Sequence, residues 1–314
     1  MNRQRILVPV DVDAQSDSAL DFARTIATRL NAMISCMYVI DQQRLHSNWH
    51  TSKEAQLKQR RDAENKLSEK VHSILKDKKT PFELIVTSGR VGEKIVEKSV
   101  QLNAQLIILG KSTSEVTRKK RIGSTTKYIL TNARIPVISM GRNKIKNREH
   151  IIVPLDLFQS IGNQVICAID TAMLLGAAVT IITVIEKEKL SLRPVYVRRL
   201  KELRLLLRDI NIDCNSHLLT AQESVAEEIL SFSVKFDSAM LLLATNNSMQ
   251  ANDLSIGSVA RELIAKSGIP VQCVNPNYVC RKLVDESGNF LKAGSLSWFS
   301  LQDHFINNQH ELEV

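Results

Sequence analysis

Short runs of apolar and β-branched residues alternate with amphipathic segments along most of the chain. Such runs have the length and composition of buried strands. In the first half of the chain they are ILVPV at 6–10, MISCMYVI at 33–40, FELIVTS at 82–88, LIILG at 106–110 and PVISM at 136–140. Strands that alternate with helices indicate a parallel sheet covered on both faces, joined by right-handed crossovers. The pattern predicts an open α/β sandwich of five strands.

Four segments between these runs have helical periodicity. LDFARTIATRL at 20–30 places Leu20, Ala23, Ile26, Ala27 and Leu30 on one face of a helix. The polar stretch 53–77 has apolar residues at helical intervals, and so do the shorter segments that follow the third and fourth strands. These apolar positions are Leu57, Leu67, Val71, Ile74 and Leu75, then Val91, Ile95 and Val96, then Tyr128 and Ile129. SGRVGEK at 88–94 resembles a phosphate-binding loop only superficially, and we interpret it as the start of the third helix.

The same pattern occurs a second time. IGSTTKYILTNARIPVISM at 122–140 returns as IGSVARELIAKSGIPVQCV at 256–274, at an offset of 134. RILVPVDVD at 5–13 matches HIIVPLDLF at 150–158, and NAMISCMYVI at 31–40 matches GAAVTIITVI at 176–185, both at an offset of 145. A spacing of this size is a whole small domain rather than a solenoid repeat. We therefore expect two copies of one domain, at 1–143 and 148–276.

Residues 277–314 have no counterpart in the first copy. The end of the chain, from 275 to 314, contains five of the 14 aromatic side chains, at Tyr278, Phe290, Trp298, Phe299 and Phe305. We expect this C-terminal extension to pack either on the protein's own body or on a second molecule.

Composition limits the classes of protein. The hydrophobic content of 44 % and the charged content of 24 % are typical of globular domains. No apolar run is long enough for a membrane helix, so we expect no membrane insertion. Five dispersed cysteines without a CxxC pair favour a reducing compartment, and the expected location is the cytoplasm.

The net charge of +9 is unevenly distributed. Residues 1–147 contain 27 Lys and Arg against 14 Asp and Glu, whereas residues 148–314 contain 15 against 19. A basic first half without aromatic stacking platforms disfavours a nucleic-acid role, although it suits an anionic ligand.

Two kinds of residue point to a ligand site at one edge of each sheet. Ligands of open parallel sheets bind beyond the carboxyl ends of the strands. Gly123-Ser124-Thr125 and Gly257-Ser258 each open a helix after the fourth strand, where free backbone N–H groups and a hydroxyl can bind an anion or simply cap the helix. Asp11 and Asp156 end the first strands and can accept from a bound base or cap the next helix.

These repeated features resemble the universal stress protein family, in the form of two fused domains. The VPVD and VPLD first strands, the Gly-Ser helix starts and the IPV last strands carry the resemblance. It implies two Rossmann-like domains of the adenine nucleotide alpha hydrolase type, each with strand order 3-2-1-4-5. It also implies a cytosolic stress-response protein that binds ATP, with Mg²⁺, and signals its occupancy. Possible partners are a second copy in a homodimer and client proteins.

Family members that bind ATP carry Gly-x2-Gly-x9-Gly-Ser/Thr after the fourth strand. In the first copy, Gly110 and Gly123 keep this spacing but Thr113 replaces the middle glycine. In the second copy, Ala244, Asn247 and Gly257 occupy the three positions. A β-branched residue fits a left-handed backbone badly, and a methyl group hinders close approach to a phosphate.

The resemblance implies a specific set of contacts. It places the adenine-side carboxylate at Asp11 or Asp156 and a backbone contact at Val39 or Val184. The phosphate contacts fall on Gly110, Gly123 and Ser124, or on Gly257 and Ser258. The first copy is the better candidate. The basic run Arg118-Lys119-Lys120-Arg121 can neutralise phosphate, contact an acidic partner or simply be solvated.

The sequence shows no catalytic constellation, so we expect at most a slow hydrolysis of ATP. The seven histidines are scattered, and neither GxxxxGK[ST] nor GxSxG is present. The alternative to a nucleotide-binding regulator is a nucleotide-free interaction scaffold of the same family.

Overall fold

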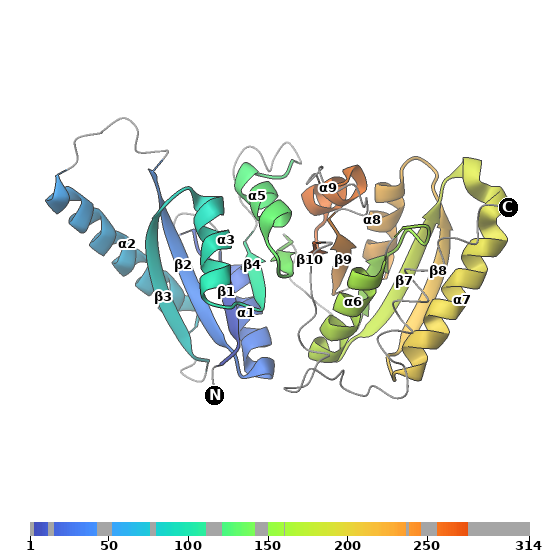
Figure 1. Ribbon diagram of the computed structural model, residues 1–314, viewed down its shortest axis with the longest axis horizontal. Helices are drawn as coiled ribbons and strands as arrows, with labels where there is room; N and C mark the ends of the chain where they lie inside the picture. The colour runs from blue at the N-terminus through green and yellow to red at the C-terminus, as the bar shows by residue number, and fades with distance from the viewer. Residues whose placement is uncertain are drawn as a thin grey trace. The chain divides into compact units, whose positions relative to one another are not determined.

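The computed structural model describes residues 3–11, 16–42, 52–75, 80–110, 121–141, 150–159, 161–236, 239–245 and 256–275. The chain divides into two compact units, Met1–Arg142 and Asn143–Val314. Each unit is an α/β layer structure with helices on both faces of its strands (Figure 1).

The strands of the first unit are β1 (Arg5–Pro9), β2 (Met33–Asp41), β3 (Phe82–Gly89), β4 (Leu106–Leu109) and β5 (Val137–Ser139). They lie in the order β3-β2-β1-β4-β5, and all neighbours are parallel. The helices are α1 (Asp17–Leu30), α2 (Lys53–Ile74), α3 (Val91–Gln101) and α5 (Ser124–Asn132). The helices α1 and α2 pack on one face, and α3 and α5 pack together on the other.

The second unit repeats this topology. Its strands are β6 (His150–Pro154), β7 (Ala178–Ile185), β8 (Cys214–Thr220), β9 (Met240–Ala244) and β10 (Val271–Val274), in the order β8-β7-β6-β9-β10. All of these neighbours are parallel too. Its helices are α6 (Gly162–Leu175), the 3-10 helix η2 (Lys187–Leu192), α7 (Arg193–Asp209), α8 (Val225–Lys235) and α9 (Ser258–Lys266). The predicted fold class and the strand order 3-2-1-4-5 are confirmed for both units.

The proline that precedes the last strand of each unit accepts a hydrogen bond from the fourth strand. A proline has no N–H for a sheet ladder, but its carbonyl still accepts. Pro136 accepts from the Ile107 N–H at 3.1 Å, and Pro270 accepts from the Leu241 N–H at 2.9 Å. Each proline therefore joins the last strand to the fourth without leaving an unpaired donor.

Two helical expectations were wrong in detail. Leu57 is 58 % exposed, and the buried residues of α2, Ala63, Leu67 and Val71, all lie further along the helix. Tyr128 is also exposed, and its ring lies over Gly92 of α3, where an added Cβ would be 2.9 Å from its Cδ1. Helical periodicity identified both helices but not which parts of them are covered.

The four cysteines in the described part of the chain are all buried. Burial, reinforced by the Glu83 carboxylate, raises the pKa of Cys36 to about 12. Burial also raises the pKa of Cys214 to about 12, although Arg204 opposes it, and raises the pKa of Cys273. Thiolates are the reactive species, so these thiols are protected in the folded protein.

We expect at most one fast-reacting thiol in the folded protein at pH 8, that of Cys280, and five after denaturation in urea. Titration with a disulfide reagent measures both numbers, and two or more fast thiols in the folded state would contradict the expectation.

The same cysteines predict how stability depends on pH. Because the pKa values of Cys36, Cys214 and Cys273 are higher in the folded protein than in the unfolded chain, unfolding releases protons at alkaline pH. The free energy of unfolding should therefore fall as the pH rises above about 8.5.

Candidate functional site

The carboxyl edge of the first sheet exposes the predicted aspartate. Asp11 follows β1, and its backbone N–H donates to the Ser16 hydroxyl at 2.9 Å. Ser16 precedes α1 and is buried. The bond ties the end of the strand to the start of the helix, while the Asp11 side chain is exposed at the edge of the sheet.

The predicted phosphate position lies at the start of α5. Gly123 is the N-cap residue, and no side chain of the described residues caps the helix. A Cβ added at Gly123 would meet no atom of those residues within 4 Å, and Ser124 and Thr125 are exposed. Gly110, at the end of β4, is half-buried. The described residues therefore leave the Gly123 side of the helix start open, and the N–H groups of a first helical turn suit an anion.

The predicted backbone contact lies on an overhanging part of β2. Pro9, the last residue of β1, pairs with Met37, and Val39 lies two residues further on. On its other side Val39 pairs with Thr87 of β3. Among the described residues, no strand pairs with Val39 on the side of β1, although Val39 itself is buried, with 7 % exposed.

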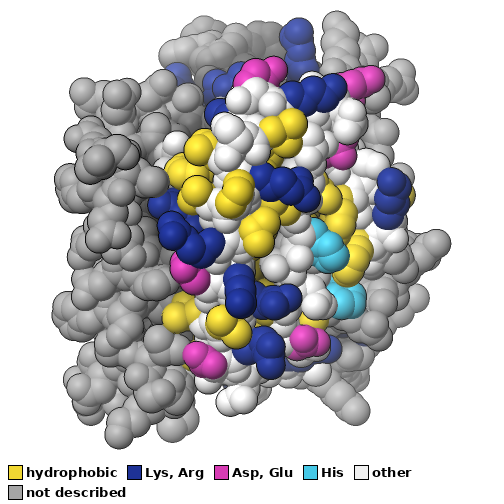
Figure 2. Space-filling model, turned by 90° about the vertical axis from the view of Figure 1, so that its right-hand side faces the viewer, with side chains coloured by type: hydrophobic (Ala, Val, Ile, Leu, Met, Phe, Trp, Pro, Cys, Tyr) yellow, Lys and Arg dark blue, Asp and Glu magenta, His cyan; other side chains and the backbone are white. Residues whose placement is uncertain are grey.

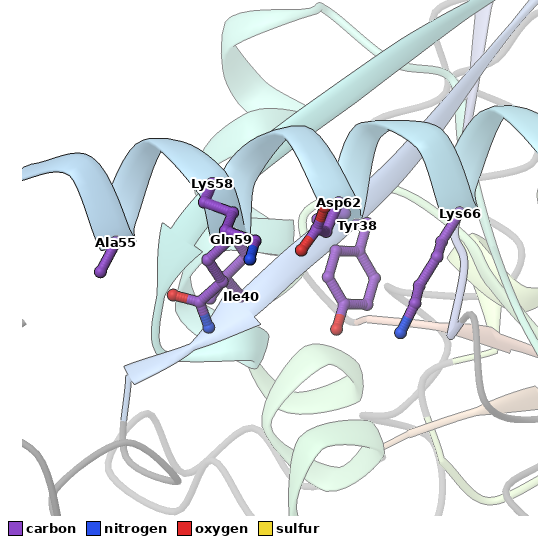
Figure 3. A pocket seen from close by; sticks show the side chains of 8 residues that line it. Tyr38, Ile40, Ala55, Lys58, Gln59, Asp62 and Lys66 are labelled. Carbon is purple, nitrogen blue, oxygen red and sulfur yellow. The ribbon is translucent and has the colours of Figure 1, made fainter.

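A cavity of about 380 Å³ lies next to this overhang, between β2 and α2 (Figure 3). Figure 3 shows Gln59, Tyr38 and Lys66 pointing to the same side of α2, with Asp62 beside the Tyr38 ring. Its size is in the range of small-molecule sites. The lining residues are Tyr38, Ile40, Ala55, Lys58, Gln59, Asp62, Ala63 and Lys66.

The second unit arranges its first strand end differently. The Asp156 carboxylate accepts from the Phe158 backbone N–H at 3.1 Å, which closes a local turn. The Phe158 ring packs edge-on against Tyr196 of α7, with ring centroids 4.9 Å apart. The Arg199 guanidinium lies 4.6 Å from the Phe158 centroid, and its Nη1 donates to the Leu157 carbonyl at 2.5 Å. Burial, helped by the Asp156 charge, raises the pKa of Tyr196.

The side chains of β7, the second strand of that unit, are also buried where the first unit has its cavity. Thr183 and Ile185, which correspond to Tyr38 and Ile40 at the offset of 145, are both buried. Thr183 Oγ1 donates to the Leu155 carbonyl at 3.0 Å. The two positions of the second unit that correspond to the cavity-lining residues Tyr38 and Ile40 are therefore buried.

The start of α9 is partly engaged as well. Gly257 is its N-cap residue and is exposed like Ser258, but the Gly257 N–H donates to the Thr245 carbonyl at 3.0 Å. No such bond is found for the Gly123 N–H among the described residues.

The other predicted site residues are placed as follows. Ala244 and Val184 are half-buried. Thr113, Asn247 and the basic residues 118–120 lie outside the described residues, whereas Arg121 is exposed.

The comparison with known families decides the nature of the first unit. Residues 2–139 match the model of the Universal stress protein family. They form a universal stress protein domain. The match confirms the resemblance carried by VPVD, by the Gly-Ser helix start and by the IPV strand. No curated protein matches the sequence of this chain.

Solved structures extend the fold of the universal stress protein domain to both units. A universal stress protein from Archaeoglobus fulgidus DSM 4304 covers 86 % of this chain and 96 % of its own, with a TM-score of 0.69 and 16 % identity. A putative universal stress protein from Pseudomonas aeruginosa UCBPP-PA14 covers 88 % and 94 %, with a TM-score of 0.63 and 16 % identity. At such identities the likeness establishes the fold alone.

Two features are absent from the described residues. They contain no helix with the length and apolar character needed to cross a membrane. Nor do these residues include three His, Cys, Asp or Glu side chains grouped closely enough to hold a metal ion.

The sequence did not predict the cavity between β2 and α2, nor the Phe158 cluster, which consists of Phe158, Tyr196 and Arg199. A signal for the cavity was available, because Lys58, Asp62 and Lys66 are spaced four apart and so share one face of a helix. The cluster had no comparable signal, since Phe158 and Arg199 are far apart in the sequence and only the fold brings them together.

Proposed function

We propose that the universal stress protein domain at 2–139 binds an adenine nucleotide, ATP with Mg²⁺, at the carboxyl edge of its sheet. In this proposal the protein acts in a stress response by signalling whether that site is occupied. The single observation that carries the proposal is the start of α5, where, among the residues that the structure describes, no neighbouring atom lies within 4 Å of a Cβ added at Gly123 and no side chain caps the helix.

The remaining residues fit such a ligand. Ser124 and Thr125 add exposed hydroxyls at the helix start, and Gly110 lies at the end of the adjoining strand. Asp11 and the overhanging backbone of Val39 can bind the base and ribose end. Mg²⁺ would neutralise phosphate charge and keep several of its waters, so few ligands from the chain are required.

For the second unit we propose a nucleotide-free role as an interaction scaffold. Asp156 is exposed, as Asp11 is, but Phe158, Tyr196 and Arg199 pack together next to it, and the Gly257 N–H already has a partner. One nucleotide per chain is the expected stoichiometry.

The pair of variants Gly123→Val and Gly257→Val tests the proposal. Both glycines have negative φ and open surroundings, so valine should fold at either position. In the wild-type chain, ATP and Mg²⁺ at 100 times Kd should stabilise the folded state by about 2.7 kcal/mol. Thermal melting should show this stabilisation in Gly257→Val and lose it in Gly123→Val, where the side chain occupies the phosphate position.

Asp11→Ala, with Asp156→Ala as its matched control, extends the same test to the base end. Loss of stabilisation in Asp11→Ala alone would support the assigned orientation. Wild-type melting that does not change at millimolar ATP with Mg²⁺ would refute nucleotide binding and leave the scaffold role for both units.

A further inference from the structure

The outer side of α7 combines basic and apolar side chains in an unusual way. Tyr196, Leu200, Leu203 and Leu207 are buried against the sheet. On the opposite side, Val197, Lys201, Leu205 and Arg208 follow one another at spacings of three and four residues, with Arg198 beside them. We call the surface formed by these residues and Leu190 of η2 the α7 face. Its members are Leu190, Val197, Arg198, Lys201, Leu205 and Arg208.

The apolar members of the α7 face are exposed. Leu190, Val197 and Leu205 have exposed fractions of 42–49 %. Figure 2, which views the side of the molecule where α7 and β8 lie, shows apolar side chains interspersed with many Lys and Arg side chains and fewer Asp and Glu. A mixed basic and apolar surface of this kind can contact a partner that has both acidic and apolar groups.

The charge on α7 contrasts with the rest of its unit. Residues 148–314 have 15 Lys and Arg against 19 Asp and Glu, yet six of those 15 lie in α7, which has only two acidic residues. No ion pair joins Arg198, Lys201 or Arg208 to a carboxylate in the described part of the chain. The α7 face therefore suits a partner that is acidic and has apolar groups of its own.

The end of the same chain has this composition. Residues 295–314 contain Asp303, Glu311 and Glu313 and no Lys or Arg. Trp298, Leu301, Phe305 and Leu312 are spaced by three, four and seven residues, which would place them on one side of a helix. The segment is thus acidic and apolar where the α7 face is basic and apolar.

The connection is long enough to reach. The described chain ends at Asn275, directly after β10, and the stretch 276–294 separates it from the acidic segment. An extended chain of that length spans about 60 Å. The strand β8 lies four positions from β10, which is about 19 Å across the sheet. Tethering raises the effective concentration of the segment to the millimolar range, so a weak docking contact suffices.

We propose that residues 295–314 dock on the α7 face of their own chain as an amphipathic helix. The apolar side chains of the segment would cover Leu190, Val197 and Leu205, and its carboxylates would pair with Arg198, Lys201 and Arg208. This gives two of the aromatic side chains near the end of the chain, Trp298 and Phe305, a surface on which to pack. The docking does not depend on nucleotide binding by the first unit.

The fluorescence of Trp298 tests the proposal in the full chain. The protein has two tryptophans, so Trp49→Phe leaves Trp298 as the sole tryptophan, which can be excited selectively over tyrosine. We expect blue-shifted emission and at least a threefold lower acrylamide quenching constant than for the free peptide 295–314. Arg198→Glu with Lys201→Glu should remove that protection, and adding Asp303→Lys with Glu311→Lys should restore it.

The matched control is Lys53→Glu with Arg61→Glu, which reverses two exposed charges on α2 and should leave Trp298 protected. Quenching equal to that of the free peptide, or unaffected by Arg198→Glu with Lys201→Glu, would overturn the proposal. Protection that disappears on dilution would assign the α7 face to a second copy and also overturn it. Binding of anionic vesicles through α7 while Trp298 stays exposed would have the same consequence.

Discussion

Replacing Gln272 with glutamate is expected to destabilise the second unit by about 3–5 kcal/mol at pH 7. Gln272 lies on β10 and is only 4 % exposed. Its amide Nε2 donates to Cys167 Sγ at 3.0 Å and to Thr171 Oγ1 at 2.9 Å, both on α6. A carboxylate at this position would be buried without any cation beside it among these contacts.

The destabilisation should depend on pH in a defined direction. Burial raises the pKa of a carboxyl group, so the carboxyl introduced by Gln272→Glu would stay protonated in the folded protein over a range where the unfolded chain is ionised. The free energy of unfolding of the variant should therefore fall, relative to wild type, as the pH rises above about 4.3. Urea denaturation at pH 4 and pH 7 measures the difference.

Two substitutions serve as controls for Gln272→Glu. Gln272→Leu removes the amide, but the Thr171 hydroxyl still donates to the Cys167 carbonyl at 2.7 Å, so the cost should be below about 1.5 kcal/mol. Gln159→Glu places the same charge at an exposed position and should change stability by less than about 0.5 kcal/mol. Equal effects of Gln272→Glu and Gln159→Glu would show that Gln272 is not buried as described.

Truncating Ile107 to alanine should cost the first unit about 2–5 kcal/mol. Ile107 is fully buried on β4, where it pairs with Leu7 of β1 and Val137 of β5. Three central strands lose packing at once, and the rigid backbone around them cannot close the cavity completely. Amide hydrogen exchange in β1 and β4 should accelerate at least about 30-fold, which corresponds to the lower end of this range.

Val100→Ala provides the contrast, because Val100 lies on α3 and is 66 % exposed. Its effect should stay within about 0.5 kcal/mol. If exchange in β1 and β4 were equally fast in both variants, β4 would not be the central buried strand that positions Gly110.

Much of the fold could be predicted because it depends on local periodicity and on duplication. The runs at 6–10 and 106–110 are apolar at every position but the last or next to last, which only a strand buried on both faces requires. The match of 5–13 to 150–158 then predicted that whatever fold one half has, the other shares. Burial within α2 was harder to predict, since Leu57 fits the helical period but is exposed, whereas Ala63, Leu67 and Val71 are buried.

The sequence by itself determined that this chain has two α/β units of one topology, and which residues stand at the carboxyl ends of their strands. Only the tertiary structure decided how those ends differ. Asp11 and Asp156 are equivalent in sequence, yet Phe158, Tyr196 and Arg199 pack together after Asp156, while the first unit has a cavity between β2 and α2. Strand and helix formation depends on neighbours along the chain, whereas an open or filled site depends on side chains that are distant in the sequence and meet only after folding.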